Sequence, residues 1–164
     1  MNIEKQYQSF KPIINIDTEI LILGSLPGKK SLELGQYYGH PRNRFWKILA
    51  SLKDAEVPVT YKEKVMFLQK FHIGVWDVIQ TALRKGSLDT NIRREIPNDI
   101  YGVLNKYRSL RVIGFNGKKA EKIFYKYFDE YPNIKYLYLP SSSPANMSIS
   151  YKEICTKWLE MFEC

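Results

Sequence analysis

The residues best suited to chemistry lie in one polar loop, QYYGHPRNRFW, at positions 36–46. Tyr37 and Tyr38 are adjacent aromatics whose rings either pack on a sheet or form a platform on which a nucleobase stacks. Asn43 either caps a following helix or uses its amide, both donor and acceptor, to contact a base edge or hold a water. For His40, bracing the Gly-His-Pro turn is favoured over a role at the base.

A second set of polar residues follows four short apolar runs, where Gly, Ser, Pro and Asn are concentrated. Such residues let the backbone approach a ligand and offer N–H and hydroxyl donors, which suits an anion such as phosphate. In any one loop they are ordinary turn residues, but four such loops together favour a ligand site. The loops are GSLPGKKS from residue 24, WDV from 76, FNGKKA from 115 and PSSSPANMS from 140.

The apolar runs predict buried parallel strands, because each is short and is followed by turn residues and then a helical pattern. They span residues 19–24, 73–76, 111–115 and 135–140. Apolar residues at helical spacing predict further segments that start near Phe45, Tyr61, Ile100, Ala120 and Ile154. Capping-box spacing marks two helix starts, at Thr60 with Glu63 and at Ser150 with Glu153.

Strands that alternate with helices predict the α/β class, as a three-layer α/β/α sandwich with a four-stranded parallel central sheet. The 164 residues are expected to form one domain, 1–164. The longest connection without a predicted helix is 25–42. Ligands of open parallel sheets bind outside the carboxyl ends of the strands, so all four polar loops are expected to share one edge.

Charge narrows the class of partner. The chain carries 25 Lys and Arg against 17 Asp and Glu, a net charge of +8, and its pI is near 9.4. This excess is typical of polyanion binders, and its spread over loops and helix starts favours nucleic acid over a membrane surface. No apolar run is long enough to span a bilayer and the start has no signal-peptide pattern, so a cytoplasmic protein is expected.

Several chemistries are excluded by spacing or residue count. GSLPGKKS resembles the phosphate-binding GxxxxGKS loop but lacks its spacing, and GxGxxG follows no strand. Cys155 and Cys164 are the only cysteines, too few for a disulfide framework or a four-cysteine iron–sulfur cluster. His40 and His72 lie far apart, so no local zinc pattern exists.

The motifs together resemble the uracil-DNA glycosylase superfamily. The resemblance is strongest to its hypoxanthine (deoxyinosine) DNA glycosylase branch, with mismatch-specific uracil-DNA glycosylases the nearest relatives. It covers about residues 19 to 150 and rests on GSLPG, QYYGHPRNRFW, GVWDV, RKGSLDTNI, FNGKKA and SSSPAN, in that order. It implies monofunctional hydrolysis of an N-glycosidic bond, without a metal or cofactor, in an α/β/α sandwich around a four-stranded parallel sheet.

The resemblance also implies roles for individual residues. Tyr38 is the expected stacking partner of a flipped base, with Tyr37 in reserve. Many members place Asp or Asn just before the Pro of the first motif, whereas this chain has Leu26 there. The hypoxanthine branch shares that lack, so Asn43 is expected to be the principal catalytic or water-orienting residue. As a neutral amide it orients and polarises water but cannot act as a general base.

The remaining residues are expected to contact the flipped base or the DNA backbone, to act as a wedge, or to cap a helix. Asn146 is the second candidate after Asn43 and is expected to contact the base or the flipped sugar, and Ser25 and Leu26 are expected to contact the base. Expected DNA-backbone contacts are Gly28, Lys29, Arg42, Ser142 and Ser143, and the expected wedge is Met147, although an ordinary helix start is the alternative for this last loop. Lys30, Arg44, Lys118 and Lys119 flank the same edge. Asp77 is expected to cap a helix after the second strand, with a role near the pocket as the weaker alternative.

The sequence therefore predicts a DNA repair glycosylase that flips out and hydrolytically removes deaminated bases, hypoxanthine first and uracil second. One alternative is a mismatch-specific uracil or thymine glycosylase. The other is a non-catalytic nucleic-acid-binding module of the same fold, since a fold does not guarantee its chemistry. The expected partner is DNA containing deaminated bases, with no membrane partner, and the expected state is a monomer.

Overall fold

A four-stranded parallel sheet forms the centre of the molecule, in the order β3 (Ile73–Asp77), β2 (Ile20–Gly24), β6 (Val112–Asn116) and β7 (Lys135–Leu139). The computed structural model describes residues 4–163. Each strand coincides with one of the four predicted apolar runs. All pairings are parallel, with Ile22 opposite both Val75 and Gly114.

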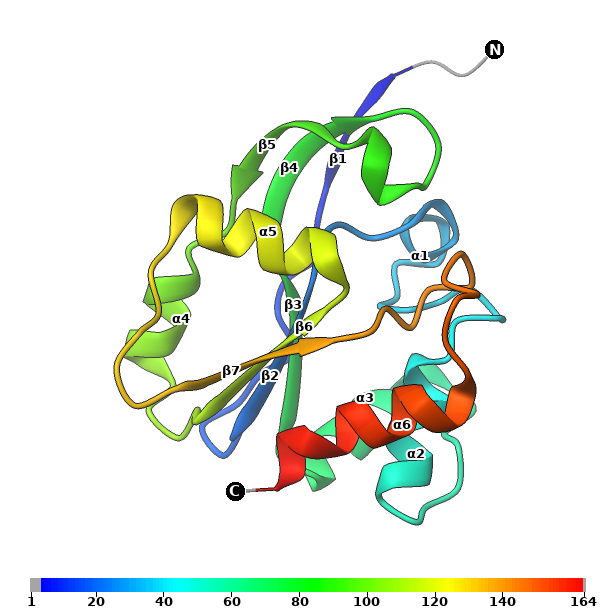
Figure 1. The fold of residues 1–164 in the computed structure, drawn as a ribbon, viewed down its shortest axis with the longest axis vertical. Helices are drawn as coiled ribbons and strands as arrows, with labels where there is room; N and C mark the ends of the chain where they lie inside the picture. The colour runs from blue at the N-terminus through cyan, green and yellow to red at the C-terminus, as the bar shows by residue number, and fades with distance from the viewer. Residues whose placement is uncertain (1–3, 164) are drawn as a thin grey trace.

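Helices cover both faces of this sheet (Figure 1). On one face lie α2 (Phe45–Leu52), α3 (Tyr61–Lys70) and α6 (Tyr151–Leu159), and on the other lie α4 (Ile100–Lys106) and α5 (Lys118–Tyr127). The predicted capping box of α3 is complete, and the Ser150 hydroxyl accepts from the Glu153 N–H at the start of α6. The predicted three-layer architecture is therefore confirmed.

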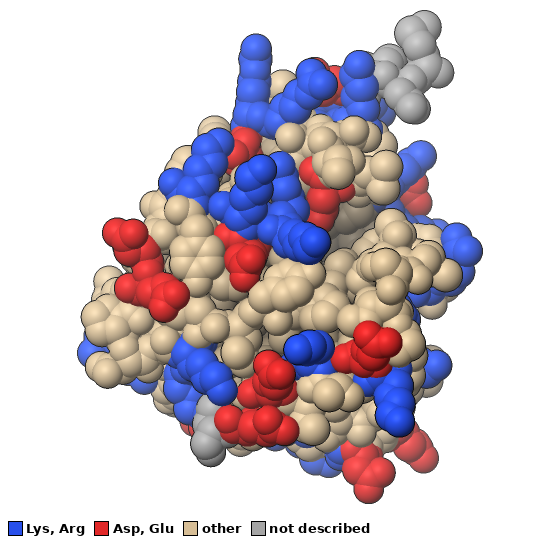
Figure 2. Space-filling model, viewed as in Figure 1, with Lys and Arg blue, Asp and Glu red and all other residues tan. Residues whose placement is uncertain are grey.

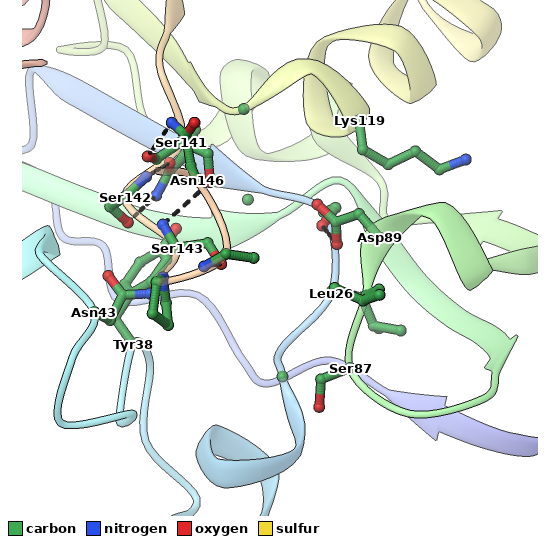
Figure 3. Close-up of a pocket in the computed structure, with 18 of the residues that line it drawn as sticks. Leu26, Tyr38, Asn43, Ser87, Asp89, Lys119, Ser141, Ser142, Ser143 and Asn146 are labelled. Carbon is green, nitrogen blue, oxygen red and sulfur yellow. Dashed lines mark hydrogen bonds between the residues drawn. The ribbon is translucent and has the colours of Figure 1, made fainter. Parts of the chain in front are cut away.

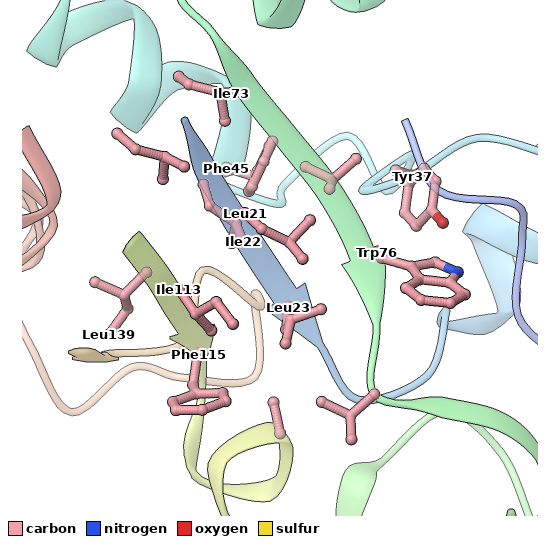
Figure 4. Close-up of a cluster of buried hydrophobic side chains, with 14 of the residues drawn as sticks. Leu21, Ile22, Leu23, Tyr37, Phe45, Ile73, Trp76, Ile113, Phe115 and Leu139 are labelled. Atoms are coloured by element: carbon pink, nitrogen blue, oxygen red, sulfur yellow. The ribbon is translucent and has the colours of Figure 1, made fainter. Parts of the chain in front are cut away.

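The core lies where the helices meet the central strands (Figure 4). Every residue of β2, β3 and β6 is buried, as expected for parallel strands covered on both faces. Phe45, from the first turn of α2, is fully buried and packs edge-on against Trp158 of α6. The helix start that carries the polar loop is thus anchored in the core.

A second sheet lies outside the sequence prediction. It is antiparallel, in the order β1 (Lys5–Gln8), β4 (Ile79–Arg84), β5 (Arg93–Pro97). β4 follows β3 after a single residue, so no helix exists there for Asp77 to cap and that expectation is wrong. β1 and β5 have no buried residue and β4 buries only three of its six, so this sheet lacks the continuous apolar run of the central strands.

The connection 25–42 also differs from expectation. It contains a short helix, α1 (Lys29–Leu34), which ends at Gly35 in the left-handed conformation, φ 65°. Single 3₁₀ turns, η1 (Asp89–Asn91) and η2 (Glu160–Phe162), complete the elements. The six residues of α1, between Gly28 and Gly35, are too few to show a helical period, so the sequence pattern did not predict this helix.

Membrane-spanning helices and cysteines are the two remaining features on which the sequence made a prediction. No helix among residues 4–163 combines the length and apolarity needed to cross a membrane. Cys155 on α6 is a half-buried free thiol, and Cys164 lies outside the described residues.

Candidate active site

A pocket of about 1050 Å³ opens at the carboxyl ends of the four parallel strands. Each of the four polar loops contributes to its lining, through Ser25, Asp77, Asn116 and Ser141 among others. The prediction that these loops share one edge is therefore confirmed. The α1–α2 loop and the hairpin between β4 and β5 complete the walls.

Tyr38 lies on one wall with its ring fixed in place (Figure 3). The ring stacks on Phe45 with centroids 3.9 Å apart and planes 15° apart, and Trp46 Nε1 donates to the Tyr38 carbonyl over 3.2 Å. The backbone is left-handed, φ 51°, a conformation that non-glycine residues seldom adopt. The pocket thus has a rigid aromatic wall, as stacking of a base requires.

Tyr37, the reserve prediction, occupies a different place. It is 3% exposed, its hydroxyl donates to the Lys11 carbonyl over 2.8 Å, and Phe10 packs edge-on against its ring. Burial raises the pKa of this hydroxyl above its ordinary value. Although Tyr37 borders the pocket, packing occupies its ring, so it does not offer a second stacking platform.

Asn43 lines the same wall at the start of α2. Its Oδ1 accepts from the Phe45 N–H over 3.0 Å, which satisfies a free N–H of the first turn of α2 from the position before the N-cap residue Arg44. This bond orients the amide plane while leaving Nδ2 and the second lone pair of Oδ1 for other partners. His40 Nδ1 accepts from the Arg42 N–H over 3.1 Å, which is the predicted bracing of the turn.

The serine-rich loop after β7 is tied down by its own side chains. Asn116 and Ser142 exchange two hydrogen bonds of 3.0 Å, and Asn146 Nδ2 donates to the Ser141 carbonyl over 2.9 Å. Arg44 also donates to the Asn146 carbonyl. Ser142 lines the pocket although it is fully buried, and its N–H and hydroxyl are both bonded to Asn116, so its predicted phosphate contact stays a prediction. Asn146 also lines the pocket.

Met147 and Ser143 lie nearer the surface of that loop. Met147 is 85% exposed and is not part of the pocket lining. Ser143 is half-buried, and its hydroxyl accepts from the Ala145 N–H. An apolar side chain at the tip of a fixed loop beside a pocket has the placement that a wedge needs.

The first loop, with Ser25 and Leu26, forms the wall opposite Tyr38 and Asn43 (Figure 3). Ser25 Oγ donates to Asp89 Oδ1 over 2.7 Å. Asp89 sits in η1, 64 positions along the chain, so a distant segment brings a carboxylate to a loop that has none in its own sequence. Asp89 belongs to the motif RKGSLDTNI, but the sequence pattern assigns it no role.

Arg84 holds the first loop from behind. It is fully buried, and its guanidinium donates to the carbonyls of Pro27 over 2.6 Å and Gly86 over 2.9 Å. The guanidinium also lies 5.1 Å from the centre of the Tyr7 ring. An arginine at a strand end looks like a surface charge in sequence, so only the fold reveals this role.

Two carboxyl groups line the pocket, from Asp77 and Asp89. Burial and the neighbouring Asp89 charge raise the pKa of Asp77 to about 8, and Arg84 partly opposes them. Burial also raises the pKa of Asp89, whereas Ser25, Arg84 and Lys119 favour its ionised form. Within residues 4–163 no three His, Cys, Asp or Glu side chains gather as a metal site would need.

Lysines surround the mouth of the pocket. In Figure 2, Lys and Arg side chains gather over α5 and the second sheet, beside the hollow. α5 starts at the pocket, where Gly117, Lys118 and Lys119 belong to the lining, and its N-cap Gly117 has φ 100°, a conformation that favours glycine. Arg42 is exposed and does not belong to the pocket lining. The lysines that do are Lys29, Lys30, Lys118, Lys119, Lys122 and Lys157.

Comparison with known proteins agrees with this geometry. A curated relative from Methanosarcina barkeri, named Hypoxanthine DNA glycosylase, is 38% identical over 157 residues, which cover 95% of this chain and 98% of the relative. A second with the same name, from Methanosarcina acetivorans, is 36% identical, covering 94% and 97%.

A solved structure also matches most of the chain. It is a solution NMR structure from Methanosarcina acetivorans whose name gives it as a candidate uracil DNA glycosylase. It has a TM-score of 0.82, 35% identity and coverage of 96% of this chain and 97% of the other. The model of the family described as the Uracil DNA glycosylase superfamily matches residues 12–162. With its pocket at the strand ends and a match over almost all of its length, the chain belongs to the uracil DNA glycosylase superfamily.

Proposed function

We propose that this protein is a DNA repair glycosylase that removes deaminated bases by base flipping and hydrolysis, with hypoxanthine the foremost substrate and uracil the second. One observation carries the proposal: Tyr38 and Asn43 line one wall of a pocket in a chain whose curated relatives are named Hypoxanthine DNA glycosylase. We also propose that it acts as a monomer in the cytoplasm.

In this proposal Tyr38 receives the flipped base. The ring is held by Phe45 on one side, so stacking requires no rearrangement of the wall. Tyr38 has an unfavourable left-handed backbone conformation, and such conformations are found preferentially at functional sites.

Asn43 then orients the attacking water. Because the Phe45 N–H fixes the amide, the remaining lone pair of Oδ1 accepts from a water while Nδ2 donates to the base or the sugar. The water attacks the sugar carbon as the glycosidic bond breaks through an oxocarbenium-like state. The Asp89 carboxylate, held by Ser25, provides negative charge on the opposite wall to stabilise that state.

The pocket lysines are expected to set the affinity for DNA and its dependence on salt. Replacing Lys118, Lys119 and Lys122 with Ala should weaken binding to all sequences alike. The slope of log K against log salt should fall in magnitude by about 0.9 for each phosphate of duplex DNA that these lysines no longer neutralise. Fluorescence anisotropy at several salt concentrations measures this slope.

Lysines away from the pocket provide the control for that titration. Lys62 and Lys70 lie on α3, and Lys135 starts β7 at the opposite edge of the sheet. The corresponding triple Ala variant should keep the wild-type slope. An equal change in both variants would mean that general surface charge, not the pocket face, binds DNA.

Met147 is expected to matter only in duplex DNA, where a wedge must replace the flipped base in the stack. We expect Met147→Ala to slow hypoxanthine excision from a duplex by roughly 10- to 100-fold, because the cost of unstacking is no longer offset. Excision from a single strand should hardly change. Met66→Ala, at a 57% exposed position on α3, is the matched control, and equal losses on both substrates would contradict the wedge.

Incubation with oligonucleotides that each carry one hypoxanthine, uracil, mismatched thymine or normal base tests the proposal. Alkali then cleaves the abasic sites. Excision fastest at hypoxanthine supports the proposed substrate. Excision only of uracil or thymine in mismatches would move the protein to the mismatch-specific class, and binding without any excision would leave a non-catalytic module.

A further inference from the structure

Asp77 lies at the inner end of the pocket and is buried without a partner. It ends β3, where it pairs in register with Gly24 of β2, and it is 4% exposed. Its Oδ2 has no hydrogen-bond partner among residues 4–163, and neither has the buried hydroxyl of Tyr38. A buried polar atom without a partner costs free energy and needs an explanation, and a ligand that enters the pocket would supply one.

The backbone holds Asp77 and Tyr38 close together over Gly24. A Cβ built on Gly24 would lie 2.7 Å from Asp77 Oδ1 and 3.0 Å from the Tyr38 hydroxyl oxygen. Both polar groups therefore occupy the space that a side chain at position 24 would take. Since all three residues line the pocket, its inner end carries a carboxyl and a hydroxyl side by side.

Burial, with the nearby Asp89 charge, favours the protonated form of Asp77 at neutral pH. Burial and the Asp89 charge of η1 raise its pKa to about 8, and Arg84 of β4 lowers it. The Tyr37 and Tyr38 hydroxyls also face it, and burial raises the pKa of both, which keeps them neutral. A neutral carboxylic acid donates a hydrogen bond and a proton, which a carboxylate cannot do.

We propose that Asp77 is the proton donor to the departing purine, a role that rests on the proposed function. Its O–H donates to the imidazole nitrogen N7 of the base. As the bond between N9 and the sugar carbon breaks, its electron pair moves into the ring and the proton passes from Asp77 to N7. The base leaves neutral and Asp77 becomes a carboxylate. Water adds to the sugar carbon and loses its proton to solvent, from which Asp77 is protonated again.

This role makes excision depend on pH and on one atom of the substrate. Single-turnover excision is measured from pH 6 to 9 with hypoxanthine and with 7-deazahypoxanthine, which lacks N7. For Asp77→Asn on hypoxanthine we expect a loss of about 100-fold or more, since Asn donates a hydrogen bond but no proton. The wild-type rate should fall above pH 8, the Asn variant should lack that decline, and 7-deazahypoxanthine should bring both proteins to a similar low rate.

The controls separate chemistry from folding. Asp54→Asn, at an exposed turn position, should keep the wild-type rate and profile. The folded-state pKa of Asp77 exceeds the ordinary Asp value. Between about pH 4 and about pH 8 Asp77 therefore ionises in the unfolded chain but not in the folded one, which makes the wild type progressively less stable as pH rises. Asp77→Asn should therefore melt at a higher temperature than wild type at pH 8, by a margin that shrinks toward pH 4.

Three outcomes would overturn the role. In the first, Asp77→Asn keeps the wild-type rate and pH profile on hypoxanthine. In the second, the losses from the variant and from the missing N7 multiply, which would mean that the two groups act independently. Active wild type in either case leaves the proposed function standing. In the third, wild type releases no hypoxanthine at any pH, which removes that function and this role with it.

Discussion

Asn43→Ser should slow hypoxanthine excision by roughly 10²- to 10³-fold, the loss typical when one fixed polar group is removed from a reacting centre. Serine keeps an oxygen that can accept the Phe45 N–H at the start of α2, so this hydrogen bond is retained while the amide is lost. Binding of the same duplex should change little. Single-turnover kinetics and anisotropy measure the two quantities.

One further variant tests which part of the Asn43 amide acts, and a second serves as its control. Asn43→Asp keeps the shape and the cap acceptor but loses the Nδ2 donor, so a similar loss would assign the effect to that donor. Asn105→Ser, on α4 and outside the pocket lining, is the matched control. If Asn43→Ser keeps the wild-type rate, Asn43 does not orient the attacking water. Asp89, beside the first loop, would then be the remaining polar candidate.

The largest effect on stability is expected at Arg84. Arg84→Met removes the donors to the Pro27 and Gly86 carbonyls from a fully buried position. The lost hydrogen bonds and imperfect repacking should lower the free energy of unfolding by roughly 3–5 kcal/mol. Urea denaturation measures this change, and excision should also fall because the first loop loses its support.

Arg84→Lys tests whether charge alone is enough. A single ammonium lacks the planar fork that reaches two carbonyls, so most of the stability should still be lost. Arg93→Met, at an exposed position of β5, is the matched control and should unfold near the wild-type midpoint. If Arg84→Met also unfolds at that midpoint, the guanidinium does not hold the loop.

The central sheet could be predicted because its signal is local. Runs such as Ile20 to Leu23 are apolar without interruption since helices cover both faces, and each run ends in turn residues. The second sheet has no such signal, because β4 buries only three of its six residues, without alternation, and no residue of β5 is buried. Its hairpin nevertheless forms a wall of the pocket.

The topology predicted that four distant loops share one edge, but which side chains lie together within the site was predictable only where they are close in sequence. Asn43 and Tyr38 share one loop, and the structure places both on one wall. Tyr37 and Tyr38 are adjacent and of the same residue type, so the sequence cannot distinguish their roles. In the structure Tyr37 packs against Phe10 in the core, whereas Tyr38 stacks on Phe45 at the pocket wall. The bond from Ser25 to Asp89 joins residues 64 positions apart, a distance over which sequence pattern does not predict pairing.

Release of free base from a hypoxanthine-containing duplex tests the proposed function most directly. Purified wild type, Asn43→Ser and Asp77→Asn are incubated with excess protein over DNA, and free hypoxanthine and abasic sites are both quantified. We expect one hypoxanthine per abasic site with wild type, and strongly slowed release with both variants while DNA binding persists. Salt-sensitive binding by wild type without release of any base would contradict the proposed function and identify a binding module.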